Sequence, residues 1–410
     1  MDDAMEITRE LLRRLPKSDL HLHLDGSVRL RTLIELATER DVHLPSQTVE
    51  GLRETVFKES YESLEDYLTG FAYTCAVMGD AESLERIAYE LALDNLDEGV
   101  RYIEVRFAPQ LHAGGGLDLP EIFTAVNRGL ARARSGFNGT EAVRSGEEPR
   151  FEYGIIACSM RFFASGFSQY FDRFMKAHTY TDLDTVFGLA SLELVGAALD
   201  ARDRLGIPVV GVDLAGAEAG YPPAHHREAY LKAHRGFMKK TVHAGEAYGP
   251  ESIFQAITEL NADRIGHGTS LFNAGAVSDP SIDDPERFVE DLAQYIADRR
   301  ITLEVCLTSN MQTTPSIGRL ENHPLGKMMD HRLSVAICTD NRTVSHTTVT
   351  DELYKVVRHF HVPLPLLKNL VVYGFKRSFF PGPYQEKRRY VRQCMERFER
   401  VVAKAGGEGA

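Results

Sequence analysis

The stretch SDLHLHL at residues 18–24 alternates polar and leucine side chains, and it is the first of eight short runs rich in apolar and β-branched residues. Long amphipathic stretches separate the runs, an alternation typical of βαβ units and a parallel sheet. Eight such units predict an α/β protein whose strands close into a (β/α)₈ TIM barrel. The other seven runs are VRYIEVRF (100–107), FEYGIIAC (151–158), VVGVDLAG (209–216), KTVHAGE (240–246), RIGHG (264–268), ITLEVCLTS (301–309) and SVAICTD (334–340).

Several segments exceed what a minimal barrel needs. Residues 81–99 predict a helix that ends at Gly99, because apolar residues recur there at near-helical spacing. An extra helical layer is expected over about 29–79, after the first strand. The polar, glycine-bearing stretch SGFNGTEAVRSGEEP (135–149) predicts a surface loop.

The C-terminal stretch 383–404 predicts a charged amphipathic helix. We expect its apolar face to pack on the barrel, and a dimer contact is the alternative. The residues placed on that face are Tyr390, Val391, Cys394, Phe398 and Val401.

Neither a sequence repeat nor a low-complexity linker divides the 410 residues. We therefore expect a single domain over 1–410, with the motif-bearing core at about 16–385.

The formal charge of −12 predicts that the chain repels nucleic acid and anionic membranes, and it favours a small neutral or cationic ligand. The five cysteines are scattered without a CxxC pair, so we expect reduced thiols. The N-terminal segment MDDAMEITRELLRRLPK lacks the apolar run of a signal peptide, and no stretch of 18 apolar residues follows. These features favour a cytoplasmic protein.

Candidate metal ligands gather at the predicted strand ends. His21 and His23, at positions i and i+2 of the first run, lie on one face of a strand. At or near the ends of three later runs stand His243, His267 and Asp340. Catalytic groups collect at this rim of a (β/α)₈ barrel, and imidazoles with a carboxylate suit zinc or a similar divalent ion.

A metal with an open coordination position generates hydroxide at neutral pH, so hydrolysis is the expected chemistry. The fourth run has no lysine at its end to bridge two metals, and Asp213 there is interpreted as structural, which favours one ion per chain. Glu246 stands three residues after His243 and is free to shuttle a proton, with a solvated loop glutamate as the competing interpretation.

Six motifs in order, namely SDLHLHLDGS, GVDLAGAE, TVHAGE, RIGHGT, LEVCLTSN and ICTDN, resemble the adenosine deaminase family. This family of adenosine and AMP deaminases belongs to the metal-dependent amidohydrolase superfamily. The resemblance spans residues 16 to about 385 and implies one zinc ion. Its implied ligands are His21, His23, His243 and Asp340.

The resemblance also implies the remaining roles. Glu246 donates a proton to purine N1, and His267 positions and activates the metal-bound hydroxide. Asp25 contacts the ribose 5′-hydroxyl, the N–H of Gly216 reaches N3, and His23 borders the substrate as well as the metal.

Two positions and one downstream stretch depart from the family's pattern. Asn341 stands where a second aspartate usually contacts N7, and its amide is a built-in donor for that atom. Leu307 replaces a proline and is interpreted as a loop adjustment after the seventh run. His346, in a divergent stretch at 342–348, is interpreted as a rim residue and not as a ligand.

The expected reaction is the deamination of adenosine and 2′-deoxyadenosine to inosine and 2′-deoxyinosine in purine salvage. Aminodeoxyfutalosine and methylthioadenosine are alternative substrates, while Asp25 disfavours free adenine. A non-catalytic nucleoside-binding protein and an amidohydrolase acting on an unrelated amide or ester are the alternatives from other classes.

Overall fold

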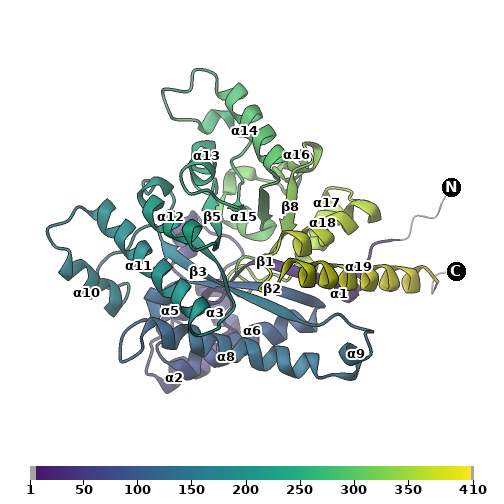
Figure 1. Ribbon diagram of the computed structural model, residues 1–410, viewed down its shortest axis with the longest axis horizontal. Helices are drawn as coiled ribbons and strands as arrows, with labels where there is room; N and C mark the ends of the chain where they lie inside the picture. The colour runs from purple at the N-terminus through teal and green to yellow at the C-terminus, as the bar shows by residue number, and fades with distance from the viewer. Residues whose placement is uncertain (1–5, 408–410) are drawn as a thin grey trace.

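The computed structural model describes residues 6–407 and contains one sheet of eight parallel strands in the order β1 to β8. The ends of the sheet meet, because the N–H of His23 donates to the carbonyl of Asp340 and the N–H of Asp340 donates to the carbonyl of His21, both at 2.8 Å. Figure 1 shows the strands at the centre with helices around them. The predicted (β/α)₈ barrel is confirmed.

All eight predicted runs form strands. Their bounds are β1 Lys17–His23, β2 Val100–Phe107, β3 Glu152–Met160, β4 Val209–Ala215, β5 Lys239–Ala244, β6 Arg264–His267, β7 Thr302–Val305 and β8 Ser334–Ile337.

The seventh run was predicted too long. Strand β7 ends at Val305, and helix α15 (Leu307–Thr313) begins within the expected strand. The fully buried Leu307 is the first residue of that helix, so its interpretation as a loop residue is wrong. Proline is favoured at this first helical position and leucine is a good helix former, so either residue is compatible with this helix start.

The predicted extra layer between β1 and β2 is confirmed, and it consists of α2 (Leu30–Glu39), α3 (Val49–Thr55), α4 (Leu64–Leu68) and α5 (Phe71–Ala76). The helix expected at 81–99 is α6 (Ala81–Asp97). The remaining helices are α1 Arg9–Arg14, α7 Pro109–His112, α8 Leu119–Asn138, α9 Glu141–Arg144, α10 Gln169–Ala177, α11 Leu183–Asp203, α12 Arg227–Arg235, α13 Pro250–Thr258, α14 Pro285–Arg299, α16 Leu325–Asp330, α17 Val349–His359, α18 Leu364–Arg377 and α19 Tyr384–Gly407.

The surface loop predicted at 135–149 is largely helical, and this prediction is wrong. Helix α8 begins with a capping box at Asp118 and Glu121 and continues to Asn138, after which α9 adds a further turn. The Arg101 guanidinium lies 4.7 Å from the centre of the Phe137 ring, which fixes the last turn of α8. The Asn138 side chain also exchanges two hydrogen bonds with the Phe151 backbone, so tertiary contacts hold this turn against its helix-breaking composition.

Helix α19 buries all five residues predicted for its apolar face. The Tyr390 hydroxyl donates to the carbonyl of Arg101 in β2 at 2.6 Å, so the helix packs on the barrel as expected. Figure 1 shows α19 lying along one side of the molecule near α1 and α18.

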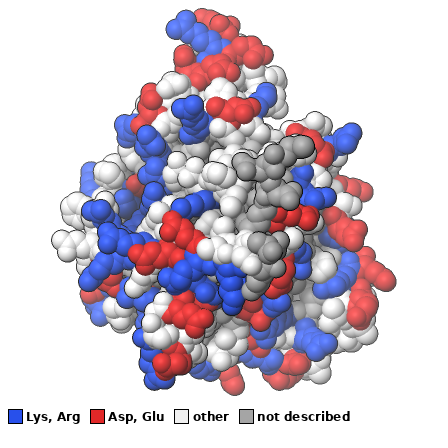
Figure 2. Space-filling model, turned by 90° about the vertical axis from the view of Figure 1, so that its right-hand side faces the viewer, with Lys and Arg blue, Asp and Glu red and all other residues white. Residues whose placement is uncertain are grey.

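On the face drawn in Figure 2, Lys and Arg side chains are interspersed with Asp and Glu side chains, without a broad field of one sign. The five cysteines form no disulfide with one another. Within residues 6–407, none of the helices combines the length and the apolar character that crossing a bilayer requires. Residues 1–5 of the N-terminal segment, and residues 408–410 of the expected domain, lie outside the described range.

Gly99 joins α6 to β2 with a φ of +89°, and a Cβ there would lie 2.4 Å from the carbonyl oxygen of Arg13. We expect Gly99→Ala to lower the free energy of unfolding by about 2 kcal/mol or more, because a left-handed backbone and a backbone clash coincide. Gly79→Ala is the matched control, since a Cβ there would meet nothing within 4 Å. Denaturant unfolding of both variants measures the difference, and equal stabilities would contradict this account.

Candidate functional site

The four predicted ligands converge at the carboxyl ends of β1, β5 and β8. His21, His23, His243 and Asp340 each present a ligand atom within 4.8 Å of the others, and all four side chains are buried. The Nε2 atom of His243 lies 3.1 Å from that of His21 and 3.2 Å from that of His23. An Asp340 oxygen lies 3.3 Å from the His21 Nε2 and 3.5 Å from the His23 Nε2.

Buried carboxylates fix two of the three imidazoles. The Nδ1 of His21 donates to Glu304 at 2.9 Å, and the Nδ1 of His243 donates to Asp213 at 3.2 Å. A histidine whose Nδ1 carries the proton presents an unprotonated Nε2, which is the metal-binding form of the ring.

This arrangement fits a metal ion. When both rings carry their proton on Nδ1, the Nε2 lone pairs of His21 and His243 face each other at 3.1 Å, and a cation between them relieves this repulsion. Ligand atoms that share one zinc ion lie about 3–4 Å apart, because zinc–nitrogen bonds are about 2.0–2.1 Å long. The four observed separations of 3.1, 3.2, 3.3 and 3.5 Å fall in that range.

The charge beneath the cluster also fits a divalent cation. Arg106 contacts Asp213 and Glu304 at 2.8 Å each, and Arg264 contacts Glu304 and Glu104. Together with Asp340, this buried network holds four carboxylates against two guanidinium groups. Two negative charges therefore remain unbalanced, which is costly in a protein interior, and a divalent cation would balance them.

The pKa values of these carboxyl groups agree with their ionised form. Burial alone would raise the pKa of Asp213, but His243 and Arg106 hold it well below its usual range. Likewise, Arg106 and Arg264 outweigh burial at Glu304 and lower the pKa of that carboxyl group. Both groups therefore accept hydrogen bonds from the histidines at neutral pH.

A hydrogen-bond relay sets the tautomer of His267. The backbone N–H of Leu325 donates to the Nδ1 of His323 at 3.1 Å, so the proton of His323 lies on Nε2 and is donated to the Oδ1 of Asn310 at 3.2 Å. The Nδ2 of Asn310 then donates to the Nδ1 of His267 at 2.9 Å. His267 consequently carries its proton on Nε2, which lies 3.6 Å from a carboxyl oxygen of Glu246.

Two site residues have left-handed backbones. His267 has a φ of +65° and Asp340 a φ of +63°. Such conformations are unfavourable for residues other than glycine and concentrate at functional sites. The Asp340 side chain is held further by the Ser309 hydroxyl, which donates to it at 2.6 Å.

The Glu246 side chain is only 8% exposed, and the loop that carries it is anchored by another carboxylate. Glu218 accepts hydrogen bonds from the backbone N–H groups of residues 245–248 at 2.7–3.1 Å. Burial, aided by the negative charge of Asp340, raises the pKa of Glu246 to about 8. The Glu246 carboxyl group is therefore protonated at neutral pH.

A cavity of about 690 Å³ opens beside the cluster, a size that suits a small organic ligand. Its wall is largely apolar, and neither lysine nor arginine occurs among its described lining residues. Every predicted site residue except His21 lines it, and these residues are His23, Asp25, Gly216, His243, Glu246, His267, Asp340 and Asn341. His346 belongs to none of the ligand clusters found among the described residues, as its interpretation required.

Asn341 has a partner that its sequence position did not reveal. Its Nδ2 donates to the Tyr67 hydroxyl at 2.8 Å, and that hydroxyl lies 2.8 Å from the Ser345 hydroxyl. The Oδ1 of Asn341 is buried and has no hydrogen-bond partner. Because the Tyr67 hydroxyl both donates and accepts, the amide can turn over and present a free N–H in place of this oxygen.

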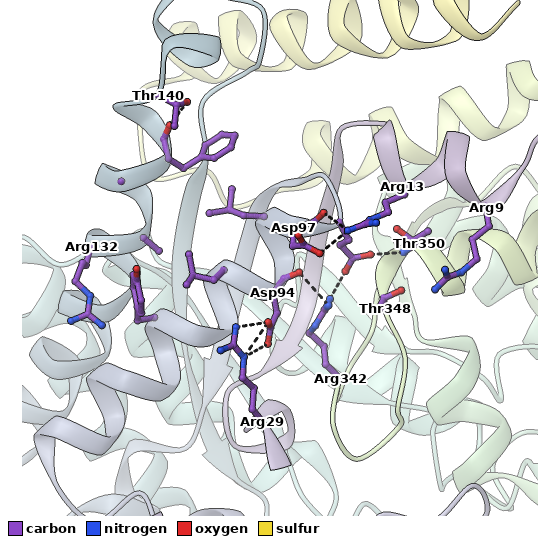
Figure 3. A pocket seen from close by; sticks show the side chains of 17 residues that line it. Arg9, Arg13, Arg29, Asp94, Asp97, Arg132, Thr140, Arg342, Thr348 and Thr350 are labelled. Atoms are coloured by element: carbon purple, nitrogen blue, oxygen red, sulfur yellow. Dashed lines mark hydrogen bonds and ion pairs between the residues drawn. The ribbon is translucent and has the colours of Figure 1, made fainter. Parts of the chain in front are cut away.

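A larger cavity of about 910 Å³ lies outside the barrel between α1, α6 and α8 (Figure 3). Figure 3 shows Arg13 and Arg29 joined to acidic side chains, and the other arginines of the cavity are paired as well, which leaves little positive charge for an anionic ligand. The pairs are Arg9 with Asp351, Arg13 with Asp97, Arg29 with Asp94, Arg132 with Glu85, and Arg342 with Glu98. We therefore place the functional site in the barrel cavity.

Sequence reasoning did not assign the supporting residues. Glu218, Glu304, Ser309 and Asn310 all stand inside the quoted motifs GVDLAGAE and LEVCLTSN, and their polar character within apolar runs was the available signal. His323 lies outside every motif.

We expect Asp213→Asn to weaken metal binding about 10- to 100-fold while the protein stays folded. Asp213 accepts from Arg106, from the N–H of Leu214 and from His243. In asparagine an NH₂ donor replaces one of the two acceptor oxygens, so at least one of these three donors would face another donor. Chelator competition measures the affinity.

Glu352→Gln is the control, because that buried carboxylate bonds to Thr347 and contacts none of the four ligand residues. Unchanged affinity in Asp213→Asn would contradict a role in holding His243.

Comparison with known proteins identifies relatives over most of the chain. The "Adenosine deaminase" family matches residues 16–197 and 189–395. "Adenosine deaminase 1" of Streptomyces coelicolor is 36% identical over 372 residues, which cover 90% of this chain and 84% of the relative. "Adenosine deaminase" of Mycobacterium avium is 34% identical over 376 residues, covering 91% and 92%.

Solved structures share the fold. A zinc-bound amidohydrolase from Burkholderia ambifaria superimposes with a TM-score of 0.76 at 20% identity, covering 99% of this chain and 97% of that one. The N6-mAMP deaminase of Arabidopsis gives a TM-score of 0.71 at 24% identity, covering 94% and 98%. The extent and order of the sequence matches, together with the barrel and its His and Asp cluster, establish that this chain belongs to the adenosine deaminase family.

Proposed function

We propose that this chain catalyses the zinc-dependent hydrolytic deamination of adenosine and 2′-deoxyadenosine, giving inosine or 2′-deoxyinosine and ammonia in purine salvage. The observation that carries the proposal is the convergence of three histidines, Asp340 and the buried carboxyl of Glu246 on one cavity of nucleoside size. The named adenosine deaminases at 34–36% identity support the same reaction.

The metal would be held by His21, His23, His243 and Asp340. A zinc ion bound there would supply a hydroxide nucleophile at neutral pH, because it lowers the pKa of its water to about 7. The bound zinc of the Burkholderia ambifaria amidohydrolase supports this choice of metal. We propose one such ion in this centre.

Glu246 acts as the proton donor to N1 of the purine. Its pKa of about 8 keeps it protonated at neutral pH, and its side chain lines the cavity. Protonation at N1 draws electrons from C6 and makes that carbon electrophilic, which prepares it for attack and for loss of ammonia.

His267 orients the nucleophile by donating a hydrogen bond. The relay through Asn310 and His323 leaves the proton of His267 on Nε2, so in the resting state this atom is a donor and not a base. We therefore assign His267 a positioning role toward the attacking oxygen, with its charge-neutral form maintained by burial that lowers its pKa.

The remaining cavity residues bind the nucleoside. Asp25 would hold the ribose 5′-hydroxyl, and the backbone of Gly216, with a φ of +100°, would approach N3. Asn341 would donate to N7 after its amide turns over, and His23 would border the substrate. We further propose that the protein is a cytoplasmic, single-domain enzyme whose ligand is this nucleoside and not a nucleic acid.

The cavity wall also ranks the alternative substrates. Nucleotides such as AMP are disfavoured, because the described lining lacks a lysine or arginine to pair with phosphate. Methylthioadenosine remains a candidate, since Cys75, Ala76 and Leu111 offer an apolar surface. A panel of adenosine, methylthioadenosine, aminodeoxyfutalosine, AMP and a cyclic amide separates these substrates. Turnover of AMP or of the amide alone would contradict the proposal.

We expect Glu246→Gln to retain its metal and to lose about 10²- to 10⁴-fold in kcat, because glutamine cannot donate the proton that N1 requires. Metal analysis of the purified variant and the ultraviolet change of adenosine measure the two properties. Loss of the metal together with activity would instead make Glu246 a ligand.

Asn341 gives a second test through the analogue 7-deazaadenosine, which lacks the N7 acceptor. We expect the wild-type enzyme to lose about 5- to 150-fold in kcat/KM with this analogue relative to adenosine, because the amide N–H is left unpaired. In Asn341→Ala the two substrates should differ far less. If the ratio of kcat/KM for adenosine to that for 7-deazaadenosine is the same in the wild type and in Asn341→Ala, contact between Asn341 and N7 is excluded.

A further inference from the structure

A second group of metal-ligand side chains lies beside the proposed catalytic centre. Asp25 comes from the short 3₁₀ helix after β1 (η1, Asp25–Ser27), Cys75 from α5 and His112 from α7. One ligand atom of each lies within 4.8 Å of the other two. This carboxylate, thiol and imidazole are 50 and 37 positions apart in the sequence. Helix α5 of the layer between β1 and β2, together with α7 just after β2, brings them together.

His112 is the unusual member of this group. It is only 5% exposed, and neither of its ring nitrogens has a hydrogen-bond partner. A buried ring nitrogen without a partner is costly, so such a side chain points to a ligand that the protein itself does not supply. Burial lowers the pKa of His112 to about 4, and the neutral ring keeps a lone pair available for a metal.

The group can be reached from the cavity. Asp25 and Cys75 both line it, and Cys75 is partly exposed there. The Oδ1 of Asp25 lies 3.8 Å from the Nδ1 of His23, so the group adjoins the first metal centre without sharing a ligand with it. An ion that enters the cavity therefore meets both groups.

We propose that Asp25, Cys75 and His112 form a second binding site for a divalent metal of the zinc class. Thiolate, imidazole and carboxylate are the ligands that zinc selects. Binding breaks the S–H bond of Cys75, forms a metal–sulfur bond and releases one proton to solvent, with no change of oxidation state.

Occupancy of this site would inhibit the enzyme, an effect that rests on the proposed function. Asp25 is the residue proposed to hold the ribose 5′-hydroxyl, and a metal on its carboxylate competes for that group. The same metal is then an activator at the first centre and an inhibitor at the second.

Cobalt(II) tests the site directly, because a thiolate ligand gives it a charge-transfer band in the near ultraviolet that zinc, a d¹⁰ ion, lacks. None of the four ligands of the first centre is a cysteine. Titrating the metal-free full-length protein with cobalt should bind two ions per chain, and the thiolate band should grow with the second. A single bound ion without the band would overturn the proposal.

Three variants locate the band. Cys75→Ser should bind one cobalt ion without the band, and that ion shows that the protein has folded. Cys158→Ser is the matched control, because Cys158 lines the same cavity outside the group, and it should keep the band. If Cys75→Ser does not fold, His112→Ala replaces it, and its stoichiometry should fall to one. A band that persists in either Cys75→Ser or His112→Ala would overturn the site.

Kinetic measurements test separately whether metal bound at the second site inhibits the enzyme. Zinc beyond one equivalent should raise the KM for adenosine about 10-fold or more in the wild type, because the Asp25 contact is lost, and should raise it far less in Cys75→Ser. If the cobalt–thiolate band appears but excess zinc does not raise the KM, the second metal site is upheld and the role of Asp25 at the ribose is contradicted. If adenosine is not turned over, the cobalt spectra still decide the site by themselves.

Discussion

A buried ion-pair network inside the barrel holds the metal-ligand cluster in place. Arg106 lies between Asp213 and Glu304. Each of these carboxylates also accepts a hydrogen bond from the Nδ1–H of a ligand histidine. Burying such charges costs several kcal/mol per ion unless each is paired, so the network is most stable when it is complete. The same contacts that pair the charges also orient the imidazoles toward the position proposed for the metal.

Two further devices fix groups that do not touch the metal. The relay from Leu325 through His323 and Asn310 sets the proton position on His267. The Glu218 carboxylate anchors the loop that carries Glu246 by accepting its backbone N–H groups. In both cases the donors that set the arrangement are backbone N–H groups, which keep their protons at any physiological pH. The proton position on His267 and the position of the loop that carries Glu246 are thus set before a substrate binds.

The sequence predicted the barrel and a metal site at its rim because both leave local signals, and the family resemblance supplied the set of four ligands. Eight apolar runs mark the strands, and the HxH pair lies on one face of the first. Residues 135–149 and Leu307 were misjudged, because tertiary packing and a helix start decided their structure against local composition. The proximity of His112 to Asp25 and Cys75 leaves no local signal at all, since three separate helical segments create it. The same holds for Tyr67, which meets Asn341 only in the folded chain.

The central claim is that a metal held by His21, His23, His243 and Asp340 enables this cavity to deaminate adenosine. The most direct measurement adds zinc in steps to the metal-free protein and follows the conversion of adenosine to inosine by ultraviolet absorption. The account predicts no turnover without metal and a rate that rises in proportion to zinc up to one equivalent per chain. Turnover by the metal-free protein, or no inosine at one equivalent, would contradict it.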